Sequence, residues 1–380
     1  MNRFYFDHNA STPVSQEVLE VLVPVLLEVH GNASSIHQDG QIARHRLESA
    51  RRQVGDLLGC QAKELVFVSG GTEADNLAIF GAIGDGCHLI TTAIEHPAVL
   101  NVCAQLGIEV TYVRVGSGGV VDPDDIRRAI RPTTRLISVM HVNNEIGTIQ
   151  PIAEIAKIAK EAGILMHSDG VQAAGRIPVN VTALGVDLYS VSGHKMYAPK
   201  GVGALYVRKG LKLNPLLYGG RHEQQRRAGT ENVPGAVAMG AAASWLAEHG
   251  ESEAIRLAGL RDRLEQGILE RVPSVSVNGG APRISGTTNL CCEGIEGESM
   301  VIALDLRGFA VSSGSACSSG AVEPSHVLMA IGLTRDRAKS SLRFSLGRTN
   351  TEEQVDALID AVAASATHLR KLSPEYVAHV

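Results

Sequence analysis

The feature that most constrains the fold is an alternation of short apolar strands, glycine-containing turns and helices between residues 64 and 207. The strands are continuous apolar runs, which is the pattern of strands buried on both faces. Strands that alternate with helices favour the α/β class, with a mostly parallel sheet and helices on both of its faces. We expect the strands at residues 65–69, 88–92, 111–115, 136–142, 164–168, 188–190 and 204–207.

The alternation ends near Gly235, where a long alanine-rich helical pattern begins and continues towards residue 268. Short strands and helices follow it, and they indicate a smaller α/β domain. A chain of 380 residues also exceeds the usual length of one compact domain. We therefore predict a large domain from residues 15–255 and a small domain from residues 1–14 and 256–380.

Composition and charge exclude several classes of protein. The net charge is −5 and the charges are interspersed, so no basic surface for nucleic acid or a membrane is indicated. The first residues lack the apolar run of a signal peptide, and the most apolar later window, residues 236–247, is too short to span a bilayer. We expect a soluble, cytoplasmic protein.

Six cysteines lie along the chain without paired spacing: Cys60, Cys87, Cys103, Cys291, Cys292 and Cys317. This is neither a disulfide framework nor a zinc pattern, and we expect no metal. Most of them suit small buried positions. Cys317 differs because it lies among small residues, in S-S-G-S-A-C-S-S-G. A thiol in such a loop can swing into a site as a nucleophile.

The central candidate for chemistry is Lys195, in S-V-S-G-H-K-M-Y-A-P-K-G-V-G at residues 190–203. Glycine and proline turn this stretch away from the strand that precedes it. A lysine held there suits an amine that forms a Schiff base, and Ser192 and His194 beside it could hold a phosphate. A surface lysine on a loop is the alternative.

Other polar residues follow expected strands, where ligands bind in open parallel sheets. The G-G-T-E sequence at residues 70–73 could bind a phosphate through backbone N–H groups and the Thr72 hydroxyl, or simply cap a helix. His96 could stack on an aromatic cofactor or be structural. Asn144 belongs to N-N-E, for which a turn-forming asparagine pair is the alternative.

Two further candidates are charged. Asp169 follows the strand at 164–168 and could keep a pyridine nitrogen protonated, which makes the ring an electron sink, or could cap a helix. Gln172 could then reach a ring oxygen. Arg343, in L-R-F-S, suits a bidentate clamp on a carboxylate, with an internal ion pair as its rival. The loop R-R-A-G-T-E-N at 226–232 is functional or merely solvated.

Together these motifs resemble the NifS/IscS-type cysteine desulfurases, which are pyridoxal-phosphate (PLP) enzymes of fold type I in the class V aminotransferase group. The cysteine loop is similar to that of the subgroup in which this loop is long and mobile. His8, Ala33 and Ala198 depart from the residues common in the family. The motifs occur in family order over nearly the whole chain: G-N-A-S-S-I-H, S-G-G-T-E-A-D-N, E-H-P-A-V, H-V-N-N-E-I-G, S-D-G-V-Q-A-A-G, S-G-H-K-M-Y-A-P-K-G-V-G, R-A-G-T-E-N, S-S-G-S-A-C-S-S-G and L-R-F-S-L-G-R.

The resemblance implies a role for each candidate. Lys195 binds PLP and later moves the Cα proton, His96 stacks on the ring, and Asp169 pairs with its nitrogen. The other implied contacts are Gln172 at the ring oxygen, Gly71, Thr72, Ser192, Gly193 and His194 at the phosphate, Thr230 from the other subunit of a homodimer, Asn144 at the cofactor and the substrate carboxylate, and Arg343 at that carboxylate.

The implied reaction takes sulfur from L-cysteine. Cys317 is the nucleophile, L-alanine is released, and Cys317 keeps a persulfide that passes to an iron–sulfur scaffold or another acceptor protein. A selenocysteine lyase or another class V PLP aminotransferase is the alternative, although a transaminase needs no thiol such as Cys317. A non-catalytic docking protein of the same fold and a zinc or dithiol protein are the rivals from other classes.

Overall fold

The computed structural model describes residues 3–84, 86–313 and 323–372. Its largest element is a seven-stranded sheet in the order β2-β8-β7-β6-β5-β3-β4. All of its strands run in one direction except β8, which is antiparallel to both neighbours, so the predicted mostly parallel sheet is confirmed. The strands are β2 (Leu65–Val68), β3 (His88–Thr92), β4 (Glu109–Val113), β5 (Thr134–Ser138), β6 (Leu165–Asp169), β7 (Leu188–Ser192) and β8 (Gly203–Val207).

Helices cover both faces of this sheet, which explains why its central strands are apolar throughout. In β3, Leu89 packs in the core under α3 and α4. Ile90 belongs to the opposite core, which contains residues of α2, α5, α6 and α8 (Val233–Arg271). The helices and single helical turns of this part are α1 (Gln16–Glu28), α2 (Gln38–Leu58), η1 (Ala62–Glu64), α3 (Gly71–Ala82), α4 (Pro97–Gln105), α5 (Pro123–Ala129), α6 (Ile152–Glu161), α7 (Val181–Leu184), η2 (Gly193–Lys195) and η3 (Glu223–Gln225).

Local sequence signals set several helix ends. The Asp122 carboxylate accepts a hydrogen bond from the Asp124 N–H at 2.8 Å and caps α5, in which Pro123 is the first residue. α2 ends at Gly59, whose φ of +69° belongs to the left-handed region that favours glycine.

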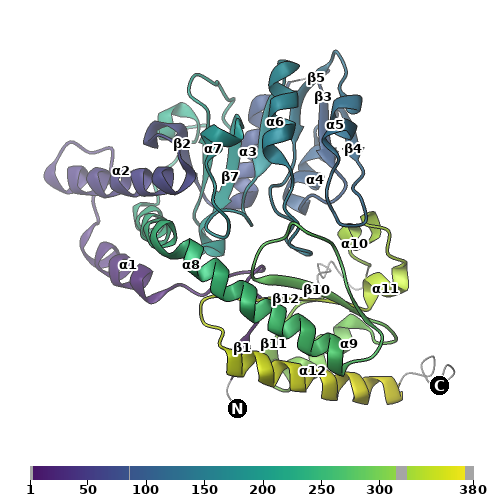
Figure 1. Ribbon diagram of the computed structural model, residues 1–380. Coiled ribbons are helices and arrows are strands. Elements are labelled where there is room, and N and C mark those ends of the chain that lie inside the picture. Colours follow the sequence, from purple (N-terminus) through teal and green to yellow (C-terminus); the bar gives the residue numbers. More distant parts are fainter. Residues whose placement is uncertain (1–2, 85, 314–322, 373–380) are drawn as a thin grey trace.

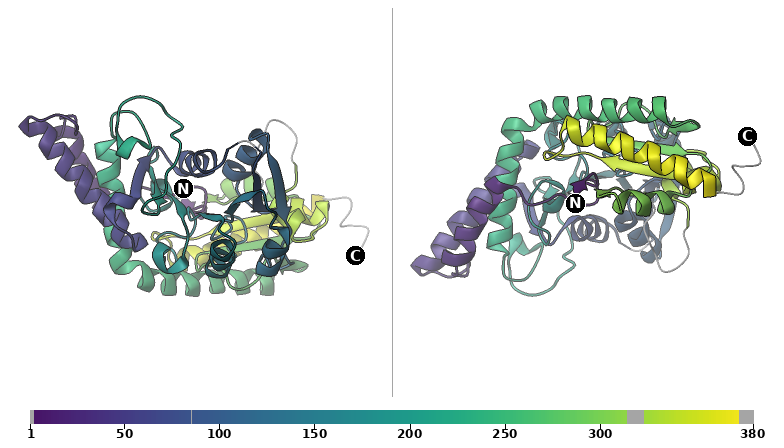
Figure 2. Two further views of the ribbon diagram at one scale, coloured as in Figure 1. Left: turned by 90° about the horizontal axis from the view of Figure 1, so that it is seen from above. Right: turned by 90° about the horizontal axis from the view of Figure 1, so that it is seen from below.

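A smaller unit is built on a three-stranded antiparallel sheet in the order β12-β10-β9. The N-terminal strand β1 joins it by pairing in parallel with β11. Figure 2 shows α8 and α12 side by side along this unit. Its elements are β1 (Phe4–Tyr5), β9 (Val275–Val277), β10 (Thr287–Cys292), α9 (Gly297–Asp305), β11 (Phe309–Ala310), α10 (His326–Ala330), α11 (Arg335–Lys339), β12 (Ser341–Ser345) and α12 (Glu352–Leu372).

The helix α8 (Val233–Arg271) spans both units and is 39 residues long (Figure 1). Its first half, up to Leu246, belongs to the core of the large sheet, whereas Leu260, Leu264 and Ile268 belong to a second core that also contains Phe6. We propose on this basis that the two domains meet within α8, at the boundary near residue 255, and that the N-terminal residues belong to the small domain. No helix in the described ranges is long and apolar enough to cross a membrane.

Candidate active site

A cavity of about 400 Å³ lies at the carboxyl ends of β6 and β7, beside the first turn of α3. Most of the predicted site residues line it together, although they come from segments far apart in the chain. Those that line it are Gly71, Thr72, His96, Asn144, Asp169, Gln172, Ser192, His194, Lys195 and Arg343. Gly193 is buried next to this group without lining the cavity, and Thr230 is exposed and does not line it. Cys317 lies outside the described residues.

Lys195 ends the single turn η2 that follows β7. Its amine donates hydrogen bonds to the main-chain carbonyl oxygens of Asn9 and, at 2.7 Å, Ala10. Burial, and after it the guanidinium of Arg176, lower the pKa of the Lys195 amine to about 7. The surface-loop alternative is therefore wrong for Lys195, because the amine lies within the protein and is a usable nucleophile near neutral pH.

Asp169 is the last residue of β6 and is buried, with the Val171 N–H donating to its carboxylate at 2.9 Å. No helix begins directly after it, so the helix-cap alternative is not realised. Gln172 is held by a 2.9 Å hydrogen bond from its amide nitrogen to the Asn9 carbonyl. Its side-chain oxygen is buried and has no protein partner in the described part of the chain. A buried acceptor without a partner is what a ligand with a donor group would satisfy.

The first turn of α3 forms one end of the cavity. The residue before this helix is Gly70, which has no side chain to cap it, so the first N–H groups are available to a ligand. A Cβ at Gly71 would lie only 2.7 Å from Val171, which explains glycine at this wall. The Ser192 hydroxyl is buried without a protein partner in the described ranges. This set of donors fits a phosphate.

His96 and the pair Asn143–Asn144 both make local backbone contacts and contribute to the wall of the cavity. His96 precedes α4, and its Nδ1 accepts from the Ala98 N–H at 3.1 Å while the ring lines the cavity. Asn143 forms the turn, since its side-chain oxygen accepts from the N–H groups of Glu145 and Ile146. Asn144 lines the cavity instead. The turn-forming alternative thus holds for Asn143 alone.

Arg343 is almost completely buried, with 6% of its surface exposed. It makes the internal ion pair that the sequence left open, to Asp7 at 2.7 Å, and donates to the Asn144 carbonyl at 3.1 Å. Its Nε still lacks a protein partner among the described residues. Arg343 therefore lines the cavity with a donor to spare for a carboxylate.

Sequence reasoning missed three residues that complete the site: Asp7, Asn9 and Arg176. Asn9 is buried, and its carbonyl accepts from both Lys195 and Gln172. The available signal was the polar sequence D-H-N-A-S-T directly after an apolar triplet, which is the pattern seen at the other strand ends. Arg176 had no comparable signal, because it follows Asp169 in a turn without regular periodicity.

Comparison with known proteins identifies the family. The model of the family described as aminotransferase class V matches residues 4–358. The chain belongs to this family. It is 48% identical to a protein named cysteine desulfurase IscS from Methanosarcina thermophila, over 97% of this chain and 93% of the relative. It is 47% identical to a cysteine desulfurase from Nostoc sp., over 98% of this chain and 95% of that protein.

Solved structures show the same class V fold. A structure titled NifS-like protein has a TM-score of 0.91 and 35% identity, and the match covers 97% of this chain and all of that chain, 100%. The NifS-like protein from Rickettsia africae has a TM-score of 0.87 and 33% identity over 96% of this chain and 99% of that chain. The fold class predicted from the sequence, PLP fold type I, is confirmed.

As a member of this class V family, the chain is a PLP-dependent enzyme. The residues of the cavity fit this cofactor: an amine of lowered pKa, a buried carboxylate, and unpartnered donors at the start of a helix. In the described ranges, no cluster of three or more metal-binding side chains is present.

Proposed function

We propose that this chain is a cysteine desulfurase, which removes sulfur from L-cysteine and gives L-alanine and a persulfide on Cys317. The observation that carries the proposal is that Lys195, Asp169 and Arg343 line one cavity. Ser312 lines the same cavity and precedes the segment that contains Cys317 in the sequence. Cysteine desulfurases at 47–48% identity over nearly the full chain support this choice of reaction.

Arg343 and Asn144 are proposed to bind the substrate carboxylate. Arg343 can donate from Nε, and its position is held by Asp7 and by the Asn144 carbonyl. Burial strengthens such a charge-assisted contact because water does not screen it. A carboxylate bound there would be fixed relative to Lys195, which lines the same cavity.

Proton transfer is assigned to Lys195. PLP, when bound, supplies an electron sink that makes the Cα proton of the amino acid acidic. Lys195 would hold the cofactor, and its amine, with a pKa of about 7, can accept the Cα proton and give it back near neutral pH. Asp169 would keep the ring nitrogen protonated. The ring would be held by His96 and Gln172, and the phosphate by Thr72, Ser192 and His194.

Sulfur transfer is assigned to Cys317. Its thiolate attacks the sulfur of the bound cysteine, so that a new S–S bond forms while the bond between that sulfur and the β-carbon breaks. The electron pair of the broken bond goes to the β-carbon, which takes up a proton and becomes the methyl group of alanine. Cys317 then carries the second sulfur as a persulfide, which we propose is passed to an iron–sulfur scaffold or another acceptor protein in the cytoplasm.

A homodimer belongs to this proposal, because Thr230 is exposed and does not reach the cavity of its own chain. Helix α1 also exposes apolar side chains: 48% of Val23, 61% of Leu26 and 76% of Leu27. Apolar surface of this kind marks an interaction site. Analytical ultracentrifugation should give twice the mass of the chain, and a monomer at micromolar concentration would contradict the assignment of Thr230.

The test of the reaction is mass spectrometry after one turnover with L-cysteine. We expect the peptide that contains Cys317 to gain about 32 Da, one sulfur atom, with release of alanine. The Cys317→Ala variant should retain PLP and lose sulfur release, whereas Cys60→Ala should behave as wild type. Transfer of the amino group to a keto acid without a persulfide would mean another class V reaction.

The covalent role of Lys195 is tested by borohydride reduction followed by peptide mapping. Wild-type protein should carry the reduced cofactor on the Lys195 peptide. Lys195→Ala should carry none and should lose about 10²–10⁴-fold in turnover, the usual contribution of a general acid–base group. Lys200→Ala, an exposed lysine in the same stretch, is the matched control.

A further inference from the structure

Arg176 carries a positive charge that no carboxylate neutralises in the described part of the chain. Its guanidinium donates to the side-chain oxygen of Asn9 and, at 2.9 Å, to the main-chain carbonyl of His8. Both acceptors are neutral. Burial lowers the pKa of Arg176 to about 10, so the guanidinium is still charged at neutral pH.

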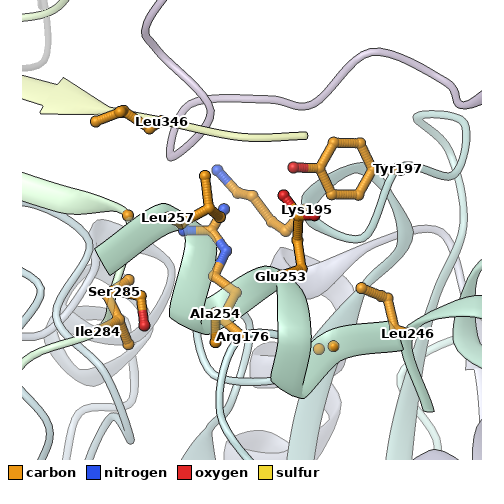
Figure 3. A pocket seen from close by; sticks show the side chains of 13 residues that line it. Arg176, Lys195, Tyr197, Leu246, Glu253, Ala254, Leu257, Ile284, Ser285 and Leu346 are labelled. Atoms are coloured by element: carbon orange, nitrogen blue, oxygen red, sulfur yellow. The ribbon is translucent and has the colours of Figure 1, made fainter. Parts of the chain in front are cut away.

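Arg176 and Lys195 share a second, small cavity of about 40 Å³, whose walls include the apolar side chains of Leu246, Leu257 and Ile284. Tyr197 and Glu253 also line it. Figure 3 shows the side chains of Arg176 and Lys195 together among those that line this cavity. Arg176 does not line the 400 Å³ cavity. Its charge therefore acts on Lys195 through a poorly screening region, and the residue is not placed to bind substrate.

Asn9 connects the two side chains. Its carbonyl accepts from the Lys195 amine, while its side-chain oxygen accepts from Arg176. The side-chain nitrogen of Asn9 donates to the carbonyl of Asn144 and the hydroxyl of Thr287, both at 3.0 Å. Because every polar group of its side chain is engaged, Asn9 cannot rotate without breaking the contact to Arg176.

The other charges that face Lys195 are balanced or act in the opposite sense. Glu253, which lines the small cavity, is paired with Arg256, and burial raises the pKa of Tyr197, so its hydroxyl stays neutral. Arg343 is paired with Asp7, and Asp169 favours the charged amine. His194 is neutral near pH 7, because burial lowers its pKa to about 4. The ring of His96 lines the same cavity and is also held toward the neutral form by burial. Arg176 thus remains the cation without a counter-charge in this group, and it is the largest influence after burial on the pKa of Lys195.

We propose that Arg176 is a positioning residue for Lys195, whose unpaired charge keeps the amine neutral and whose bond to Asn9 fixes the carbonyl that the amine contacts. A neutral amine is required because only its lone pair can bond to a carbonyl carbon or accept a proton. The inference rests on the proposed function only in the role of Lys195.

The experiment measures the protonation of Lys195 directly in the full chain freed of PLP. Competitive labelling with acetic anhydride between pH 5 and 10, read by mass spectrometry of the Lys195 peptide, gives the midpoint of its titration. We expect a midpoint near 7 in the wild type. Arg176→Gln should raise it by about one unit, since a like charge is removed, and so reduce labelling at pH 7 about fivefold. Arg176→Lys should restore the midpoint, because it keeps the charge.

In the holoenzyme, the pH-dependent absorbance of bound PLP should shift in the same direction in Arg176→Gln. Arg135→Gln is the matched control, because Arg135 also donates to neutral acceptors, here two backbone carbonyls, and lies at the opposite end of the sheet strands. An unchanged midpoint in folded Arg176→Gln would overturn the proposal, whatever the protein does with cysteine.

A second variant keeps the proposal testable if Arg176→Gln does not fold. Asp7→Asn removes a carboxylate that pairs with Arg343 and that, when present, raises the pKa of the Lys195 amine. If unpaired guanidinium charge sets the state of the amine, the midpoint should fall below that of the wild type. A midpoint that stays the same or rises in Asp7→Asn would contradict the mechanism.

Discussion

At the scale of single residues, the shape of the cavity depends on a glycine in its wall as much as on the polar side chains that line it. Gly71 starts α3 and lines the cavity together with Thr72 and Ser192. A methyl group there would lie 2.7 Å from a methyl of Val171, closer than such atoms approach one another. The first turn of α3 and the turn after Asp169 can therefore approach closely only with glycine at this position.

Gly71→Ala should weaken PLP binding. Overpacking of this kind costs about 1–3 kcal/mol, which corresponds to about 5- to 150-fold in Kd. The measurement is an absorbance titration of the cofactor-free protein with PLP. Gly84→Ala, in the loop after the same helix and with nothing within 4 Å of the added carbon, should leave Kd unchanged. Equal effects in the two variants would remove the steric explanation.

At the scale of elements, α8 is the helix that connects the two cores, and its glycines differ in their surroundings. A Cβ at Gly240 would lie 2.8 Å from the backbone of Ala50 in α2, so this glycine allows the two helices to approach closely. Gly259 lies on the exposed side, where a Cβ would meet nothing within 4 Å. The same substitution therefore has opposite consequences at two points of one helix.

Gly240→Ala should destabilise the protein by about 1–3 kcal/mol, because the added carbon overpacks the contact with α2. Gly259→Ala should stabilise it by about 0.5–1 kcal/mol, because alanine favours the helix over glycine in an exposed position. Urea denaturation of both variants measures the free energy of unfolding. Since the gain in helix propensity is common to both, stabilisation by Gly240→Ala would refute the close packing.

The end of β5 also differs from the position that the apolar pattern of the sequence predicts. The apolar run predicted as a strand at 136–142 forms β5 only up to Ser138. Met140 and Val142 remain buried, in smaller clusters near the cavity rather than in the ladder of the sheet. A buried loop and a buried strand have the same apolar composition, so the sequence could not separate them.

At the scale of the whole molecule, burial keeps several titratable groups uncharged. It lowers the pKa of His141 to about 4 and of His167 to about 3, and it raises the pKa of Glu95 to about 8 and of Glu145 to about 7. For the histidines, the stabilisation is present above the unfolded value of 6.5 and is lost as the pH falls towards the folded value. For the glutamic acids, the stabilisation is present below the unfolded pKa of 4.5. It is lost as the pH rises from there through the folded values of about 7 and 8.

Because the two contributions oppose one another between pH 4.5 and 6.5, the melting temperature should change little in this range, fall towards pH 8.5 and fall below pH 4.5. Thermal unfolding at pH 4, 5, 6.5 and 8.5 measures this directly. Glu95→Gln should flatten the alkaline side, because glutamine cannot ionise, and should leave the acidic side as in the wild type. The exposed carboxylate variant Glu251→Gln is the control. A melting temperature that rises steadily to pH 8.5 would contradict the assignment of the buried acids.

The sequence by itself determined the class of the fold and most of the polar residues that line the cavity. Continuous apolar strands that alternate with helices are compatible with few other arrangements than a covered parallel sheet. Because parallel strands end at one edge, polar residues after those strands meet there, as Asp169, Ser192 and Lys195 do.

Only the tertiary structure decided how the N-terminal segment completes the site. Asp7 pairs with Arg343 across 336 positions of sequence, and Asn9 contacts Lys195 across 186. Periodicity reports which face of an element is buried, but it carries no information on which distant segment covers that face. The position of Asn9 and the unpaired charge of Arg176 depend on how the two cores pack around α8, which is set by long-range contacts and not by local pattern.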